Sequence, residues 1–493
     1  MATERSPGFK LFFAGLIGLV LIIPLMMVYA LSWDRQEQAT TAQKSIAEGW
    51  GGPQTMVGPV LVIPYTADST ETVTENGQQK TRTVRVTKEL YLSPETNSIK
   101  TDLKPERKKK SIYESVLFVA ANSGSARFAF PADFARYGIS RENLNFTGAE
   151  LRFGVSDARG LQADSKVLVN GQSRELQPGK GLAASGNSGF FTFIDWDGAS
   201  PLEVKYDFAF RGNKSLTMVP RGGETNWEVK SSWPSPSFAG DFLPTKRTVA
   251  DSGFTSTHKV TNLALGQSLV LTEDMGAPQP SGDRLYEAPM VSASAAQQAI
   301  GGPSQAATIG LIQPVDLYSQ VDRSVKYGFL FIGFTFLAFL MFDVVAGAKV
   351  AAAEYLLTGA GLVLFFVLLL AFAEVVGFTI AYLIAAGSIT GLLTAYSAAV
   401  LKSWLRARVI GGLLLGLYAI LYVLLNLEAY SLLIGSVLLF VALAVVMWAT
   451  RMIDWGGKRD SDEVTVSGPL PSPPAAPNKP ARKVATATAA SSD

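Results

Sequence analysis

The chain of 493 residues contains no cysteine and a single histidine, His258. The absence of cysteine excludes disulfide bonds, thiolate catalysis and cysteine-ligated metal sites. One histidine leaves little room for a histidine-rich metal site or a proton relay. The 43 basic and 41 acidic residues give a net charge of only +2, which does not indicate a nucleic-acid partner. We therefore expect neither a metal nor another cofactor.

Charged residues are also scarce between Arg323 and Trp455, where five apolar segments follow one another. A bilayer core of about 30 Å requires about 20 residues of helix, and these segments meet or approach that length. A sixth apolar segment lies alone near the N-terminus. The sequence thus predicts an integral membrane protein with six transmembrane helices, at 11–31, 327–346, 354–373, 376–400, 409–427 and 430–449.

The first apolar segment has two interpretations. Val28-Tyr29-Ala30 resembles the small-residue cleavage site of a secretory signal. The apolar run exceeds the ~7–15 residues of a signal peptide, which favours an uncleaved anchor. Either interpretation sends the chain from residue 32 onward across the membrane.

The basic residues of the short loops predict the orientation, because they are retained on the cytoplasmic side. The turns around Glu374 and Glu428 contain no basic residue. The other turns contain Lys349, Lys402, Arg406, Arg408, Arg451, Lys458 and Arg459. We therefore expect residues 1–10 and the tail in the cytoplasm, and residues 32–323 outside.

The exterior region 32–323 is predicted to be β-rich, because apolar and polar residues alternate in several runs. Asn76-Gly77 between β-prone stretches predicts a hairpin. We expect an antiparallel sandwich or a twisted-sheet assembly, either as one unit or as two lobes that meet near 164–189. The tail, 456–493, is rich in proline, alanine and serine and is predicted to be disordered.

Candidate catalytic and metal-binding residues are few. Any serine–histidine mechanism requires His258, but Ser185 and Ser188 do not lie in a Gly-x-Ser-x-Gly motif. We therefore expect His258 to be a surface residue of a strand. The run from Asp195 to Gly198 lacks the remaining spacing of a calcium loop and is better explained as a turn.

Three further features have alternative interpretations. The basic run 107–110 could contact anionic headgroups or an acidic polymer, or be a solvated connection between strands. The charged residues of the spans lie at segment ends, which disfavours an ion-coupled transporter. The pairs Gly387/Gly391 and Gly412/Gly416 have the spacing that permits close helix packing.

Several blocks resemble the CreD family of inner-membrane proteins over about residues 50–455. They are Gln54 with Gly58-Pro59-Val60-Leu61-Val62-Ile63-Pro64-Tyr65, Ser156-Asp157-Ala158-Arg159-Gly160, Ser231-Ser232-Trp233-Pro234-Ser235-Pro236-Ser237-Phe238, Pro314-Val315-Asp316-Leu317-Tyr318, Glu428-Ala429-Tyr430-Ser431 and Thr450-Arg451-Met452-Ile453-Asp454-Trp455. The chain departs from the family pattern at Lys110-Ser111, at Ala373 and Val375 on either side of Glu374, and at His258, where an aromatic residue is expected.

The resemblance implies an inner-membrane protein of Gram-negative bacteria, linked to envelope maintenance and to a two-component stress response. It implies no enzymatic activity. We therefore expect a non-enzymatic protein whose partners are the bilayer and a periplasmic protein or cell-wall component. A transporter or flippase of an amphipathic envelope molecule is the alternative, followed by an exterior hydrolase. The sequence specifies no oligomeric state.

The junction between the exterior domain and the second span is the candidate structural site. Arg323 and Lys326 can extend toward lipid phosphates, and Tyr318 and Tyr327 suit the same interface. We expect Asp316 to pair with Arg323, which would fix the β-rich domain relative to the membrane. Generic anchoring at the interface is the alternative.

Overall fold

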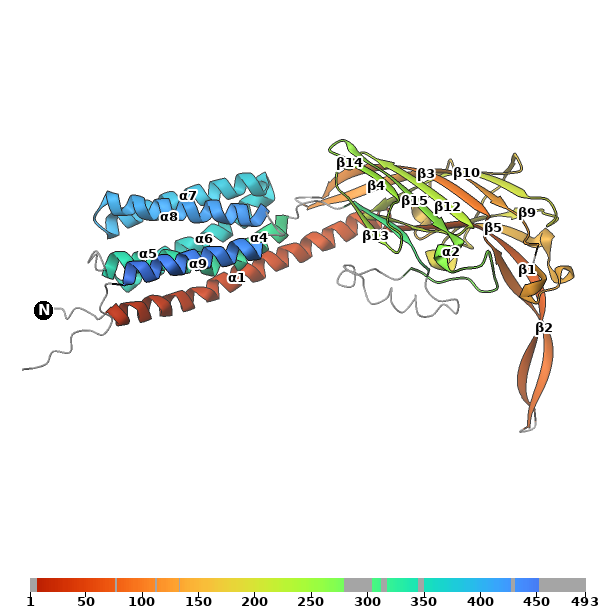
Figure 1. The fold of residues 1–493 in the computed structure, drawn as a ribbon, viewed down its shortest axis with the longest axis horizontal. Coiled ribbons are helices and arrows are strands. Elements are labelled where there is room, and N and C mark those ends of the chain that lie inside the picture. The colour runs from red at the N-terminus through yellow and green to blue at the C-terminus, as the bar shows by residue number, and fades with distance from the viewer. Residues whose placement is uncertain are drawn as a thin grey trace, which may run out of the picture.

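The computed structural model describes residues 7–75, 78–110, 113–132, 134–278, 304–311, 317–344, 350–426 and 431–451. The chain forms a helical bundle at one end and a large β-rich domain at the other (Figure 1). Residues 456–493, predicted to be a disordered tail, lie outside the described residues.

The helices have the order that the hydropathy predicts. They are α1 (Pro7–Glu48), α2 (Asn262–Leu265), α4 (Leu317–Lys326), α5 (Gly328–Val344), α6 (Ala352–Val376), α7 (Phe378–Val400), α8 (Trp404–Asn426) and α9 (Ser431–Thr450). Within the described residues, five helices are long and apolar enough to cross a membrane: α1, the run α4–α5, α6, α7 and α8. The prediction of six such spans is corrected to five. The sixth predicted segment, 430–449, coincides with α9, an apolar helix that exposes Leu433 and Phe440.

Helix α1 does not end where its apolar segment ends. It continues from the predicted span 11–31 to Glu48 as one helix of 42 residues, about 63 Å long at 1.5 Å per residue. Residues 32–48, expected to belong to the β-rich domain, therefore form a helical stalk. Figure 1 shows this stalk joining the bundle to the domain. The stalk contains no glycine or proline, and Gly49 and Gly51 follow its end.

The β-rich domain contains two sheets. Sheet A has the order β13-β17-β11-β1-β5-β9-β8, with β2 paired to β1 and β16 to β2; sheet B has the order β14-β15-β12-β3-β4-β10-β6-β7. The strands of sheet A are β1 (Gln54–Glu75), β2 (Gln78–Leu92), β5 (Ala149–Val155), β8 (Gln177–Pro178), β9 (Gly189–Ile194), β11 (Ser215–Val219), β13 (Pro236–Gly240), β16 (Val270–Leu271) and β17 (Ala307–Leu311). Those of sheet B are β3 (Thr96–Lys110), β4 (Tyr113–Phe128), β6 (Lys166–Val169), β7 (Gln172–Arg174), β10 (Leu202–Asn213), β12 (Glu224–Ser231), β14 (Lys246–Ala250) and β15 (Gly253–Thr261).

Both sheets are mixed, which corrects the expectation of antiparallel sheets. Strand β1 pairs in parallel with β11, and β3 in parallel with β12. Each parallel pair joins strands that lie far apart in the sequence, so the local alternation that predicts strands does not reveal their direction. The other described pairs are antiparallel.

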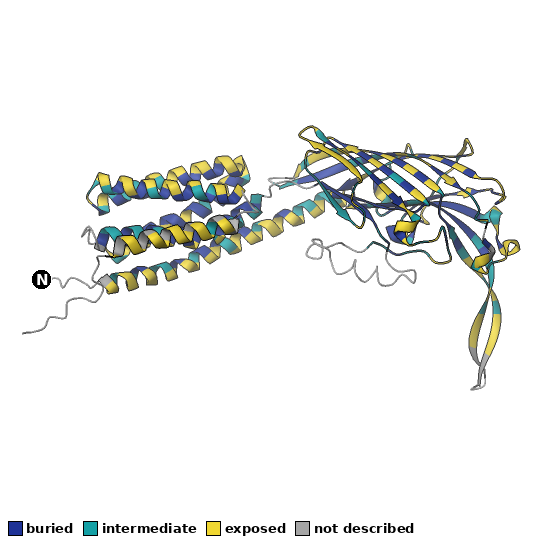
Figure 2. Cartoon of the chain, in the orientation of Figure 1, coloured by how far each residue is buried: buried dark blue, intermediate teal, exposed yellow. Residues whose placement is uncertain are grey.

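One hydrophobic core lies between the two sheets. It contains Leu61 and Phe153 of sheet A together with Phe118, Phe210 and Trp227 of sheet B. Along β10, buried and exposed residues alternate, so one face of the strand packs inward and the other faces solvent (Figure 2). The domain is therefore a sandwich with one core that both sheets share.

The predicted hairpin at Asn76-Gly77 is confirmed by the pairing of Glu75 with Gln78, although residues 76–77 lie outside the described residues. Its outer part projects from the sandwich as a two-stranded ribbon. We call residues 66–75 of β1 and 78–87 of β2 the arm. Figure 1 shows the arm at the end of the domain farthest from the bundle.

Candidate functional site

The first candidate site is the junction where α1 leaves the bundle. The Glu374 carboxylate, at the end of α6, lies between two other helices. Its Oε1 accepts a hydrogen bond from the Tyr318 hydroxyl of α4 at 3.3 Å and lies 3.9 Å from Arg35 Nε of α1. The Glu374 side chain is 13 % exposed, so water screens these interactions only in part. One carboxylate thus joins α1, α4 and α6.

The start of β4 connects this junction to the β-rich domain. The Tyr113 hydroxyl donates to Gln38 Oε1 at 3.2 Å, and Gln43 Nε2 donates to the Glu114 carbonyl at 3.1 Å. Two turns of the stalk therefore hold the end of sheet B that is nearest the bundle. This contact places the basic run 107–110 beside the stalk.

The end of the stalk is held at Trp50. Its Nε1 donates to the Phe118 carbonyl at 3.4 Å. The Lys108 ammonium lies 3.8 Å from the centre of the Trp50 ring, and the Arg211 guanidinium lies 4.5 Å from it. Such cation–π contacts stabilise the position of an indole ring. The stalk is thus attached to sheet B at Gln38 and Gln43, and the chain is attached again at Trp50, just past the end of the stalk.

The sequence-predicted junction residues that the structure describes lie in the same region. Asp316 lies outside the described residues, so its predicted pairing with Arg323 stays a prediction. Arg323 Nε donates to the Ser319 carbonyl at 3.2 Å. Lys326 Nζ lies 2.7 Å from Asp322 Oδ2 and 5.8 Å from the Tyr29 ring centre.

Two of the predicted aromatic residues pack on the bundle. Tyr318 is buried, and Tyr327 is partly buried against the same helical core. Sequence reasoning did not find Arg35, Gln38, Tyr113 or the role of Glu374. Glu374 was identified only as a residue of an outer turn, and no local pattern links it to residues more than 300 positions away.

The second candidate site is a trough of about 630 Å³ on the outer face of sheet B. Its lining residues belong to β3, β4, β10, β12, β15 and the loop at 162–164, and none of those described belongs to sheet A. Two cross-strand rows form most of it: Asp207, Ser123, Lys100, Glu228 and Thr257, then Ala209, Ala121, Asp102, Lys230 and Thr255. Both rows contain residues with short side chains, and the space above these side chains forms the trough.

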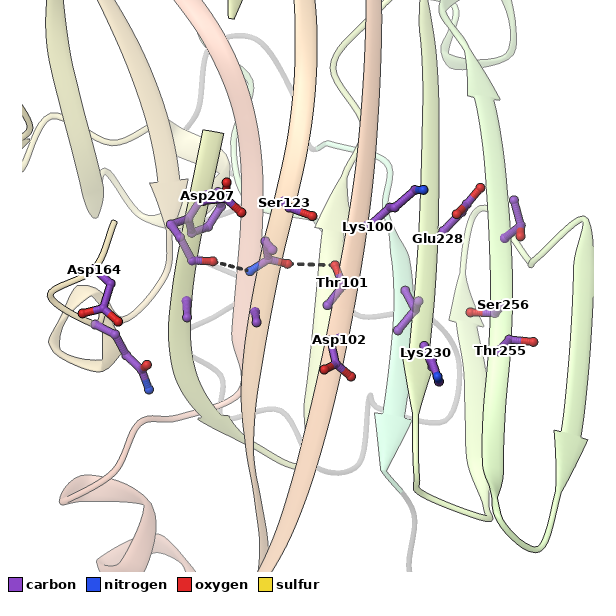
Figure 3. A pocket seen from close by; sticks show the side chains of 17 residues that line it. Lys100, Thr101, Asp102, Ser123, Asp164, Asp207, Glu228, Lys230, Thr255 and Ser256 are labelled. Carbon is purple, nitrogen blue, oxygen red and sulfur yellow. Dashed lines mark hydrogen bonds between the residues drawn. The ribbon is translucent and has the colours of Figure 1, made fainter. Parts of the chain in front are cut away.

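The trough is polar and more acidic than basic. Figure 3 shows Lys100, Asp102, Asp207, Glu228 and Lys230 along its strands. With Asp164 the lining contains four carboxylates and two ammonium groups. Hydroxyl groups of serine and threonine lie between the charges. This arrangement suits a polar ligand that carries hydroxyl or amino groups.

A buried hydrogen-bond chain supports the floor of the trough. Trp227 Nε1 donates to Thr101 Oγ1 at 2.9 Å, and Thr101 Oγ1 donates to Asn122 Oδ1 at 2.8 Å. The Asn122 amide donates in turn to the Phe208 carbonyl at 3.4 Å (Figure 3). These bonds join β12, β3, β4 and β10 directly beneath the outer face, so the trough has a fixed base.

His258 is buried rather than at the surface, which corrects the expectation from the sequence. It lies on β15 with 1 % of its surface exposed, and its ring centre is 5.0 Å from that of Trp227. Burial lowers the pKa of His258 to about 4, and the Trp227 backbone opposes this shift in part. Alternation along β15 places His258 on the same inward face as Phe254 and Val260.

The structure does not bring the serine candidates to His258. Ser185 Oγ donates to the Leu182 and Ser188 carbonyls, in a loop packed on sheet A, whereas His258 belongs to sheet B. The acidic run at 195–198 forms a turn, as expected. Asp197 Oδ1 accepts from the Ala199 and Ser200 backbone amides at 2.9 and 3.2 Å.

The bundle carries a charged contact at its other end. Lys10 Nζ of α1 lies 2.9 Å from Asp343 Oδ1 of α5, and the Asp343 side chain is 2 % exposed. The sequence predicted Asp343 at a segment end, and there it has a basic partner from the first helix. Both ends of the predicted first span are therefore joined by polar contacts to helices that come after the β-rich domain.

Comparisons with known proteins agree with the fold. The family described as "Inner membrane protein CreD" matches residues 6–456. The inner membrane protein CreD of Escherichia coli (strain K12) is 31 % identical over 442 residues, which cover 89 % of this chain and 91 % of that protein. A crystal structure of an M1 zinc metallopeptidase from Deinococcus radiodurans covers 44 % of this chain and 42 % of its own, with 8 % identity and a TM-score of 0.21. That last similarity is too low to support an argument.

Proposed function

This chain belongs to the CreD family of inner-membrane proteins, and from that membership we propose a non-enzymatic role in envelope integrity or envelope stress response. In this role the β-rich domain lies in the periplasm and binds an envelope component. The trough on sheet B is the binding site, and the junction around Glu374 holds the domain to the bundle.

The placement of the domain is supported by the distribution of charge. Basic residues occur in the turns that the topology assigns to the cytoplasm and are absent from the turns around Glu374 and Glu428. Lys10 at the start of α1 agrees with this assignment. We therefore place both termini in the cytoplasm and residues 32–323 in the periplasm.

The shape of the trough is the observation that supports binding most directly. It crosses β10, β4, β3, β12 and β15, and neighbouring strands lie about 4.8 Å apart, so the rows extend roughly 19 Å. A hollow of this length, lined by both charges and hydroxyl groups, suits an extended polar polymer better than a small apolar ligand. A cell-wall strand or an extended segment of a periplasmic protein has this chemistry.

The non-enzymatic part of the proposal is supported by the position of His258. A general base must reach the proton that it removes. His258 instead packs in the core against Trp227, and lining carboxylates of the trough such as Asp102 and Glu228 lie on the opposite face of the sheet. The described residues of the trough contain no serine–histidine pair.

The test is site-specific photo-crosslinking in intact cells that express the full chain. A photoreactive amino acid replaces Ser123 in the trough, and the control position is Asp251, in the exposed turn between β14 and β15. We expect adducts from the Ser123 position that decrease when Asp207→Lys and Glu228→Lys are added. Equal capture from both positions, together with full complementation of a deletion strain by the charge-reversed variant, would refute binding in the trough.

The junction is tested separately, because it is proposed to hold the domain rather than to bind the ligand. We expect Asp316→Ala, Arg323→Ala and Glu374→Gln to reduce complementation while the chain still inserts into the membrane. The matched control is Glu273→Gln, an exposed carboxylate of the β-rich domain. If all three junction variants complement as well as the parent, the junction provides only generic anchoring.

A further inference from the structure

The arm is a two-stranded ribbon that no other described strand covers. Beyond the body of the sandwich, β1 pairs only with β2, from Thr66 with Thr87 to Glu75 with Gln78. Strand β2 pairs with β16 only at its other end, through Tyr91 and Leu92. Both edges of the arm thus present backbone N–H and C=O groups without a described strand beside them.

Such a ribbon is unusual in an isolated protein. Two strands without a covering layer are only marginally stable in water, and natural proteins blunt exposed strand edges. The arm is nevertheless rich in threonine and valine, which favour extended backbone. Among the described side chains, Asp68, Thr70, Thr83 and Arg85 are exposed. A partner that covered the arm would therefore stabilise it.

The charges of the arm are separated by strand. Residues 66–75 of β1 contain Asp68, Glu71 and Glu75 and no basic residue, whereas residues 78–87 of β2 contain Lys80, Arg82 and Arg85 and no acidic one. Within one arm, opposite charges face each other, as in the 3.9 Å contact between Arg85 Nε and Asp68 Oδ1. One edge strand is acidic and the other is basic.

The direction of the arm limits what it can reach. In Figure 1 the arm runs across the long axis of the molecule, whereas the helices of the bundle run along that axis. It therefore extends roughly parallel to the membrane plane, at the end of the domain farthest from the bilayer. Ten residues of strand at about 3.4 Å each give a reach of roughly 30 Å. Copies of this chain in one membrane hold their arms at the same height.

We propose that the arm is an interaction surface for a second copy of this chain, in which the basic β2 edge of one arm pairs with the acidic β1 edge of the next. The new strand pair is antiparallel and continues the ribbon into a wider sheet. This inference goes beyond the proposed function, because it concerns self-association and does not involve the trough.

The charges also select the symmetry of the contact. A twofold axis normal to the membrane would bring the same edge of both arms together, so acidic β1 would face acidic β1, or basic β2 would face basic β2. Like charges directly opposite each other are destabilising in a sheet. Pairing of β2 with β1 places Arg85 of one copy beside Asp68 of the next. The copies therefore associate head to tail, in a row or ring.

The absence of cysteine from the chain makes a direct test simple. Thr70→Cys and Thr83→Cys variants are made singly in the full chain, with different tags, and expressed alone or together in membranes. Thr70 and Thr83 pair with each other across the two strands of one arm. When a second arm lies beside the first in the same orientation, Thr83 of one copy also lies opposite Thr70 of the next. We expect roughly tenfold more disulfide-linked dimer in the mixture than in either variant alone. In the mixture a basic β2 edge that carries one cysteine meets an acidic β1 edge that carries the other, whereas a single variant can be cross-linked only where two edges of the same charge meet.

Two controls separate arm pairing from random collision. Thr248→Cys, on the exposed edge strand β14, reports collision between copies. Arg82→Glu with Arg85→Glu on the Thr83→Cys copy reduces the cross-link, and Asp68→Lys with Glu71→Lys on the Thr70→Cys copy restores it. A ribbon that was merely damaged by the first change would not be rescued by a change in another molecule.

Three results would overturn the proposal. The first is a mixture that gives no more dimer than the Thr248→Cys control. The second is cross-linking of Thr70→Cys alone, or of Thr83→Cys alone, as strong as in the mixture. The third is a cross-link that joins the arm only to a different protein.

Discussion

Acid is expected to destabilise the β-rich domain through His258. Its pKa is about 4 in the folded protein because the ring is buried against Trp227, compared with about 6.5 for an exposed histidine. Between these two values the unfolded chain binds a proton that the folded chain does not. Stability is therefore lost as the pH falls from about 6.5 toward 4, and it is unaffected by this residue above pH 7.

The size of the effect is set by the two pKa values. At pH 5 the difference opposes folding by roughly 2 kcal/mol, and below pH 4 by roughly 3 kcal/mol. Either amount is a large part of the stability of an ordinary domain, which is about 5–15 kcal/mol. His258→Phe keeps an aromatic ring beside Trp227 and cannot take up a proton.

The assay compares unfolding of the parent and of His258→Phe in detergent at pH 8 and pH 5. Guanidinium midpoints are followed by tryptophan fluorescence, to which all eight tryptophans contribute, Trp227 among them. We expect the free energy of unfolding to fall between the two pH values by roughly 2 kcal/mol more in the parent than in the variant. The other titrating groups are present in both proteins. The difference between the fall in unfolding free energy of the parent and that of the variant therefore reports His258. An equal fall in both would refute the reasoning.

Three further predictions concern packing and the ends of α1. Gly124→Ala should destabilise the domain by about 1–3 kcal/mol, because the added methyl group would overlap the buried Tyr206 ring, and thermal unfolding measures this. Lys10→Met should destabilise the bundle by up to about 3 kcal/mol, because it leaves the Asp343 carboxylate buried without its partner, and adding Asp343→Asn should recover most of the loss in a double-mutant cycle. Trp50→Ala should loosen the end of the stalk and increase protease cleavage at residues 49–53, with cleavage elsewhere in the domain unchanged.

The membrane part of the fold could be predicted because hydropathy is local. Each predicted span falls largely on one helix, and the alternation along β10 is the alternation of burial in the structure. The stalk was missed because the predicted helix ended with the apolar run of α1. A usable signal was present, since residues 32–48 contain neither glycine nor proline and three glycines, Gly49, Gly51 and Gly52, come soon after.

The burial of His258 was also available from the sequence. Phe254 and Val260 share its face of β15 at a period of two, which predicts an inward direction for His258 as well. His258 was expected at the surface because histidine was treated as a polar residue, and this expectation was wrong. The family resemblance led us to expect an aromatic residue at this position, and the imidazole ring packs on Trp227.

The contacts of the junction could not be predicted in this way. Arg35, Tyr113, Tyr318 and Glu374 come from four separate elements, and nothing in their local sequence connects them. The same is true of the parallel pairs of strands and of the trough, which depends on small residues from several strands. Only the assembled fold brings these residues together.

The contact between Lys10 and Asp343 joins residues 333 positions apart. When α1 emerges from the ribosome, none of its helical neighbours has been synthesised, and the whole β-rich domain is made before α5 arrives. The first helix is therefore made well before the helices that it contacts in the bundle. The contact between α1 and α5 can form only after the whole β-rich domain has been synthesised.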